Sequence, residues 1–90
     1  MLLSVESVER ASAHELMCTV RCLDGTVALG NTFDAVEADG RSSVAVSLLV
    51  TQMYRYEDVA VKFIDPPHGA RIVMAGTGAQ AVVRGTRLRG

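Results

Sequence analysis

The sequence predicts an all-β domain in which many short antiparallel strands form a barrel or a sandwich. Within residues 16–22, small or apolar side chains occupy every second position: Leu16, Cys18, Val20 and Cys22. A period of two places these side chains on one face of a strand. Turn signals follow at Asp24-Gly25 and Gly30-Asn31, which leave no room for a helix between them. The apolar fraction of 49%, with 4% aromatics and no Trp, predicts a core of aliphatic side chains.

In chain order, strands are expected at residues 2–8, 16–23, 26–29, 32–37, 43–54, 59–64, 70–75 and 86–89. Loops or turns are expected between them at 9–14, 38–42, 54–58, 65–69 and 76–78, with a short turn-like segment at 79–84. The turn at 38–42 rests on Asp39-Gly40. The break at 65–69 rests on Pro66 and Pro67, because proline cannot donate to a strand ladder. Three sets of side chains are expected to share faces: Leu3 with Val5, Phe33 with Ala35, and Val59 with Val61 and Phe63.

Residues 43–54 form the longest predicted strand, and both of its faces are largely apolar. One face would carry Val44, Val46, Leu48 and Val50, and the other would carry Ala45, Ser47, Leu49, Thr51 and Met53. Two apolar faces are typical of a strand covered on each side or placed at a partner interface. A helix is the competing interpretation, but the repeated Val residues favour a strand.

The bulk properties indicate one globular domain, residues 1–90. The formal net charge of −1 lacks the basic excess that is usual for nucleic-acid binders, so any basic surface must be local. No apolar run reaches the roughly 18 residues of a membrane span, and the first residues show no basic region of a signal peptide. We therefore expect a cytoplasmic protein that does not contact a membrane.

No constellation of residues in the sequence points to catalysis. Cys18 and Cys22 would lie about 13 Å apart along one strand, beyond the roughly 7 Å that a disulfide spans, so two free, buried thiols are expected. Gly76-Thr77-Gly78 lacks the Lys-Ser/Thr of a phosphate loop. A strand would also spread His14 and the cysteines too far apart to bind a metal. We expect no enzymatic activity and no nucleotide, metal or cofactor.

Several short motifs, in order along nearly the whole chain, carry a resemblance to a known family. They are Leu2 to Val8, Thr19-Val20-Arg21, Gly25-Thr26-Val27, Leu29-Gly30 and Phe33, then Gln52 to Arg55, Ile72 to Gly76 and Val82 to Leu88. Together they resemble domain 2 of the translation GTPases, such as that of elongation factor Tu. The resemblance implies a small closed antiparallel β-barrel of the translation-factor domain 2 type, without the GTP-binding domain.

The resemblance also implies a binding site. In the elongation factor the barrel holds the 3′ end of aminoacyl-tRNA, partly through a Glu-x-x-Arg pair. Gln52 and Arg55 stand at the matching positions here, so the arginine is kept and the acid is replaced by an amide. Since that charge is lost and the family's nearby Asn has no counterpart around Arg71, aminoacyl-tRNA itself is not the expected ligand.

Two functions remain open from the sequence. The first is a non-catalytic module that contacts RNA or a translation-related protein, because arginine forks bind phosphate. Its candidate residues are Gln52, Arg55, Arg71, Arg84, Arg87 and Arg89, and the resemblance would bring Arg55 and Arg71 near the C-terminal arginines. A solvated edge that prevents aggregation is the simpler reading of those arginines. The second function is a protein–protein or homo-oligomerisation module that docks through the face carrying Leu49, Thr51 and Met53.

Overall fold

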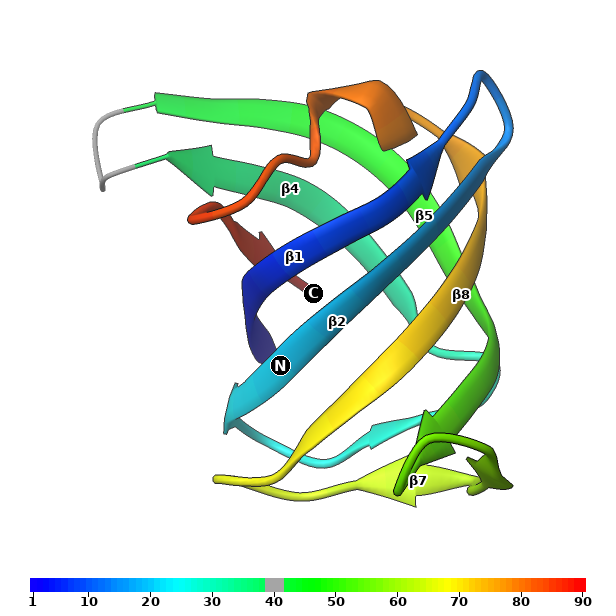
Figure 1. Cartoon of the computed structure of the whole chain (residues 1–90). Helices are drawn as coiled ribbons and strands as arrows, with labels where there is room; N and C mark the ends of the chain where they lie inside the picture. Colours follow the sequence, from blue (N-terminus) through cyan, green and yellow to red (C-terminus); the bar gives the residue numbers. More distant parts are fainter. Residues whose placement is uncertain (39–41) are drawn as a thin grey trace.

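The computed structural model describes residues 1–38 and 42–90, and within them six strands close an antiparallel β-barrel (Figure 1). The strands are β1 (Leu2–Ala11), β2 (Glu15–Asp24), β4 (Thr32–Ala38), β5 (Ser42–Arg55), β8 (Gly69–Thr77) and β9 (Arg87–Arg89). Around the barrel the order is β4-β9-β1-β2-β8-β5, and β5 pairs again with β4 to complete the ring. The predicted small closed antiparallel barrel is therefore confirmed.

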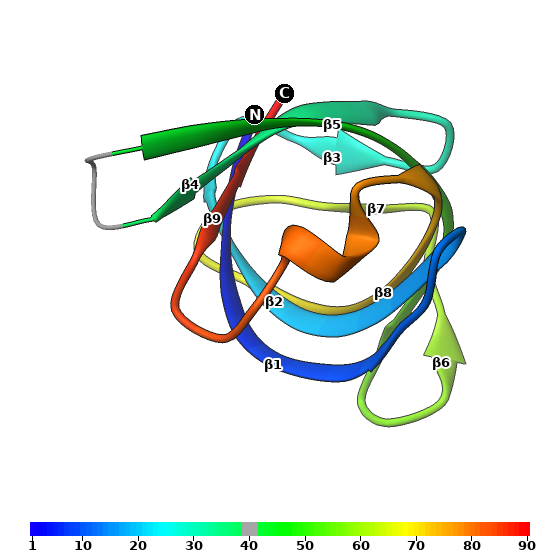
Figure 2. The ribbon, with the colours of Figure 1, turned by 90° about the horizontal axis from the view of Figure 1, so that it is seen from above.

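Shorter elements cover the two ends of the barrel. β3 (Val27–Ala28) pairs with β7 (Phe63–Ile64), and β6 (Val59–Ala60) pairs with the end of β5. A single 3₁₀ turn, η1 (Ala79–Ala81), lies across the opposite end (Figure 2). Across residues 1–38 and 42–90, no helix has the length and apolarity needed to cross a bilayer.

The core is filled by alternate side chains of the strands, as the period of two predicts. In β2 the buried set is Leu16, Cys18, Val20 and Cys22, and in β1 it includes Leu3 and Val5. Phe33 is the largest fully buried side chain. Both thiols are free and buried, so the expectation that they do not pair is also confirmed.

Two predicted loops are in fact parts of strands. The connection expected at 9–14 begins only after Ala11, where β1 ends. Ser12 closes the tight turn there by donating its backbone N–H to the carbonyl of Glu15 at 2.9 Å. The turn expected at 76–78 begins only at Gly78, because β8 runs to Thr77 and Gly76 within it donates its N–H to the carbonyl of His14. The turn predicted around Asp39-Gly40 lies outside the described residues.

Register shifts changed the predicted faces of β4 and β5. Phe33 is buried, but the next buried side chain of β4 is Val36 rather than Ala35, since the pairing with β5 shifts between Phe33 and Ala35. In β5 a shift between Val50 and Gln52 turns Met53 into the core, where it is 1% exposed. The outward face predicted for Leu49, Thr51 and Met53 was therefore wrong at Met53.

The first residues of β5 and the segment that follows β5 also differ from the prediction. Val44 is 49% exposed rather than inward-facing, because β4 and β5 project together beyond the barrel (Figures 1 and 2). The single strand predicted at 59–64 is split into β6 and β7. Between them Val61 donates its N–H to the carbonyl of Met53, which bends the chain, and Ile64 rather than Phe63 enters the core.

Candidate functional site

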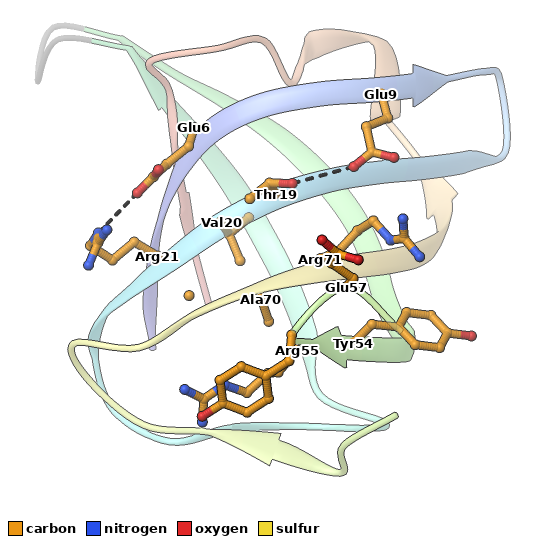
Figure 3. Close-up of a pocket in the computed structure, with 12 residues that line it drawn as sticks. Glu6, Glu9, Thr19, Val20, Arg21, Tyr54, Arg55, Glu57, Ala70 and Arg71 are labelled. Atoms are coloured by element: carbon orange, nitrogen blue, oxygen red, sulfur yellow. Dashed lines mark hydrogen bonds and ion pairs between the residues drawn. The ribbon is translucent and has the colours of Figure 1, made fainter. Parts of the chain in front are cut away.

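A groove runs over the outer surface of β1, β2 and β8 and is bounded by the hairpin of β5 and β6 (Figure 3). Its volume is about 410 Å³. The lining residues come from well-separated parts of the chain: Glu6, Glu9, Thr19, Val20, Arg21, Tyr54, Arg55, Tyr56, Glu57, Gly69, Ala70 and Arg71. Among them three glutamates face three arginines, so the groove is mixed in charge rather than basic.

Two β-bulges aim acidic side chains at the groove. In the pairing of β1 with β2, Val5 faces Val20 and Ser7 faces Thr19, which leaves Glu6 as an extra residue. Glu9 is the extra residue of a second shift, between Val8 and Arg10. A bulge re-aims the side chain of its extra residue and is common beside functional sites.

Both bulged glutamates are held by side chains of β2 (Figure 3). Glu6 Oε1 accepts a hydrogen bond from Arg21 Nε at 3.0 Å, and Glu9 Oε1 accepts one from Thr19 Oγ1 at 3.4 Å. Arg21 also donates from a terminal nitrogen to the carbonyl of Pro67 at 3.1 Å. Arg21 is therefore already engaged by protein acceptors.

Two arginines lie on tyrosine rings at the other wall of the groove. Arg71 and Tyr54 face each other across β8 and β5, with the guanidinium carbon 5.3 Å from the ring centroid. The guanidinium carbon of Arg55 lies 4.9 Å from the ring centroid of the neighbouring Tyr56. Such cation–π contacts hold a guanidinium in place and leave its N–H groups free to bind an acceptor.

Arg71 is weakly paired for a half-buried arginine. Its Nε is buried and has no hydrogen-bond partner within the described part of the chain. A terminal nitrogen lies 3.8 Å from Asp58 Oδ1, but the Asp58 side chain is 92% exposed. An ion pair this long and this solvated contributes little to stability, so Arg71 can exchange it for an anionic ligand at low cost.

The turn between β5 and β6 is strained. Tyr56 and Glu57 have φ angles of 51° and 74°, in the left-handed region that disfavours side chains with a Cβ. Each such residue costs roughly 1–2 kcal/mol. The strained turn places both side chains along the groove, and strain of this kind clusters at functional sites.

The structure divides the arginines that the sequence grouped together. Arg55 and Arg71 line the groove, and Gln52 lies beside it, where its amide oxygen accepts a hydrogen bond from the Tyr54 hydroxyl. Arg84, Arg87 and Arg89 are exposed in or next to β9, which β1 and β2 separate from β8 in the barrel. The expectation that Arg55 and Arg71 approach these arginines was therefore wrong.

Arg89 has its own partner on the far wall. Its Nε and a terminal nitrogen donate to the two carboxylate oxygens of Glu37 at 3.0 and 3.2 Å. These hydrogen bonds, with the charge of Glu37, raise the pKa of Arg89 above its usual value. Arg89 therefore has a structural role, because its bidentate pair with Glu37 links the neighbouring strands β4 and β9.

The buried thiols add no chemistry to the site. Burial raises the pKa of Cys18 to about 12, and burial likewise raises the pKa of Cys22, whose thiol donates to the carbonyl of Gly25. A thiol that stays protonated is a poor nucleophile and metal ligand. In the described ranges, no group of three or more His, Cys, Asp or Glu side chains is placed to hold a metal ion.

Sequence reasoning missed most of the groove. Glu6 and Glu9 lie in bulges that alternation does not reveal, and Tyr56 and Glu57 lack the Asn-Gly or Asp-Gly signal of a turn with positive φ. The one available signal was Tyr54-Arg55-Tyr56, an arginine between two aromatics.

Comparison with known proteins adds no named relative. No family model matches the chain, and no match was found among the curated proteins or the solved structures. The groove, with its paired arginines and tyrosines, is therefore the feature from which a function can be inferred.

Proposed function

We propose that the chain is a non-catalytic binding module of the translation-factor domain 2 type, which contacts RNA through the groove and acts in the cytoplasm. The observation that carries the proposal is the pair of Arg–Tyr stacks, Arg71 on Tyr54 and Arg55 on Tyr56. Guanidinium forks bind phosphate, and aromatic rings stack on unpaired bases. Single-stranded RNA presents phosphates and unpaired bases at regular spacing.

The size and shape of the groove favour a short unpaired segment of RNA. Its volume of about 410 Å³ falls in the range of roughly 300–1,000 Å³ that is typical of small-ligand sites. A duplex would instead need a broad surface of phosphate contacts across its grooves. A few unpaired nucleotides can enter the groove and place a base against a tyrosine.

The arginines and the glutamates of the groove have separate roles in this proposal. Arg21 is occupied by Glu6 and by the carbonyl of Pro67, so Arg55 and Arg71 are the phosphate-binding groups in this proposal. Glu9 and Glu57 would repel phosphate, but a carboxylate accepts hydrogen bonds from exocyclic amino groups and ribose hydroxyls. Glu9 and Glu57 thereby favour contact with the base or ribose of a nucleotide over contact with additional phosphates.

The family resemblance also favours the side of the barrel that carries β5 as the site of RNA contact. Gln52 and Arg55, which match the elongation factor's contact pair, both lie on β5 next to Tyr54. Arg87 and Arg89 lie on β9, on the opposite side of the barrel from β8, and they are left out of the proposed contact together with Arg84, which is absent from the groove lining.

RNA binding can be tested by fluorescence anisotropy with a labelled single-stranded RNA at about 50 and 200 mM salt, where phosphate contacts differ strongly in strength. Arg71→Ala and Arg55→Ala should each weaken binding and flatten the salt slope by about one unit. Tyr54→Leu should weaken binding and leave the slope unchanged, because stacking involves no counterion release. Arg87→Ala, on the opposite wall, is the matched control and should change neither quantity.

Failure to bind at about 50 mM salt, where phosphate contacts are strongest, would refute the RNA proposal. An equal loss on Arg87→Ala would exclude the groove as the contact. In either case a protein partner becomes the leading proposal, supported by large apolar side chains that are exposed: Leu29, Leu49, Val59 and Phe63. Leu49, at 41% exposed, is then the first residue to substitute.

A further inference from the structure

The projecting end of β5 has one paired edge and one open edge. Its pairing with β4 runs from Ser42 to Leu49, whereas its pairing with β8 begins only at Ser47. Residues 42–45 therefore have a strand on one side and, within the described residues, no backbone hydrogen bond to any segment on the other. Val46, the next residue, is 8% exposed and packs against Gly78, where an added Cβ would lie 3.2 Å from the Val46 Cα. Figure 1 shows β4 and β5 extending together past the rest of the barrel.

This open edge lacks the features that usually prevent strand addition. The segment Ser-Ser-Val-Ala carries no charge and no proline, and its register with β4 is regular from Ser42 to Ala45. Natural edge strands are normally protected by charges, prolines or bulges. β1 offers the contrast, since beyond Val5 it contains both bulges and the charged residues Glu6, Glu9 and Arg10.

We propose that this edge pairs with the same edge of a second copy of the chain, antiparallel, about a two-fold axis at Val44. In that register Val44 faces Val44 of the second copy and Ser43 faces its Ala45, so the ladder between the two copies covers residues 43–45. A two-fold interface requires a patch that is complementary to itself. This patch meets the requirement because it brings no like charges together across the axis.

The chemistry of the edge favours a second copy over an unrelated peptide. Recognition of a foreign strand depends on pockets for its alternate side chains, and residues 42–45 present serines, an alanine and the 49% exposed side chain of Val44. The interface joins two barrels through a short ladder, and interfaces below about 1,200 Å² are usually weak. The dimer should therefore form reversibly with rising concentration.

Sedimentation equilibrium between about 10 µM and 1 mM, the range suited to weak association, tests the proposal. The mass of the wild type should rise from that of a monomer towards that of a dimer. Val44→Lys should remain monomeric, because two ammonium groups would meet at the axis. Val59→Lys is the matched control: Val59 is a strand valine of similar exposure, 52%, on β6, and its substitution should leave the dimer intact.

A cross-linking experiment tests the register. Directly opposed residues of antiparallel strands have Cα atoms about 4.5–5.5 Å apart, within the range for a disulfide. Val44→Cys should therefore form a disulfide-linked dimer on mild oxidation, and Val59→Cys should not; the native thiols are buried in both. Circular dichroism confirms that each variant is folded.

The proposal is overturned if the wild type remains monomeric to about 1 mM, a concentration that populates even weak dimers. It is equally overturned if Val44→Lys associates like the wild type, or if Val44→Cys cross-links no better than Val59→Cys. None of these substitutions touches Arg55, Arg71 or Tyr54, so dimerisation and RNA binding can fail independently.

Discussion

The guanidinium of Arg71 lies over the ring of Tyr54, and the two residues face each other across the paired strands β8 and β5. Each is fixed by its own strand, so the stack exists before any ligand arrives. A guanidinium held in this way loses less conformational entropy on binding than a free surface arginine. The arrangement has a cost, because Arg71 Nε is buried without a hydrogen-bond acceptor in the described part of the chain.

Arg71→Met should therefore raise stability while it weakens the proposed RNA contact. An unsatisfied buried polar atom costs about 1–3 kcal/mol, and the lost stack offsets roughly 0.5–1 kcal/mol of that. We expect the free energy of unfolding to rise by about 1 kcal/mol in urea titrations. Arg87→Met, on an exposed position, should stay within about 0.5 kcal/mol. A clear loss of stability on Arg71→Met alone would show that the Arg71 stack is structural.

Relief of the strained turn is a second prediction. Glu57→Gly removes a left-handed penalty of roughly 1–2 kcal/mol and adds about 0.5–1 kcal/mol of backbone entropy cost. The variant should thus be more stable by roughly 0.5–1 kcal/mol, measured as a shift in the urea midpoint. Glu57→Ala is the control, since it removes the same carboxylate and keeps the penalty. Equal stability of the two variants would contradict the positive φ at Glu57.

A third prediction concerns the close approach of β8 to β5. At Gly76, with φ of 143°, an added Cβ would overlap the carbonyl oxygen of Ser47. Gly76→Ala should therefore combine overpacking with backbone strain and cost about 3 kcal/mol or more. Gly30→Ala is the comparison: its φ is 87°, but nothing lies within 4 Å of the new Cβ. It should cost roughly 1 kcal/mol, the strain alone. Thermal melting that ranks Gly30→Ala as the worse variant would refute this explanation.

A fourth prediction is a loss of stability at alkaline pH. Cys18 has a pKa of about 12 in the folded protein against 9.0 for an ordinary thiol. Above pH 9 the unfolded chain loses this proton while the folded chain keeps it, so the unfolded state gains the advantage. Stability should fall by about 1.4 kcal/mol per pH unit from this group as pH rises from 9 towards 12.

Urea midpoints at pH 8 and pH 10.5 measure the alkaline effect. Cys18→Ala should be less stable at pH 8, because it leaves a cavity, but its stability should decline less between the two pH values. A decline as steep as that of the wild type would show that other groups cause the pH dependence.

Local patterns in the sequence were enough to predict the strands and the barrel. Alternation and β-branched residues place Leu16 to Cys22 and Val46 to Val50 on buried faces, because a half-buried sheet requires a period of two. Several of the wrong predictions occur where one residue is inserted into the ladder. The shift before Gln52 turned Met53 inward, and those at Glu6 and Glu9 formed part of the groove.

The groove itself depends on relationships that are not local. Its lining comes from β1, β2, β8 and the β5–β6 turn, and which arginines meet is decided by the order of strands around the barrel. Arg55 and Arg71 line the same groove because β5 and β8 are neighbours. Arg87 and Arg89 do not join them because β9 enters between β4 and β1, a placement that no short pattern encodes.

The position of β9 also dictates when the protein can fold. Leu88 pairs with Leu3 on one side and with Val36 on the other, so the ring stays open until residues 87–89 have left the ribosome. The hairpins β1–β2 and β4–β5 involve nearby residues and can form earlier, whereas closure must wait for a contact between distant parts of the chain. During that interval the edges of β1 and β4 that receive β9 are unpaired and vulnerable to mispairing. Three residues thus set the length of the period in which a nascent chain needs protection from aggregation.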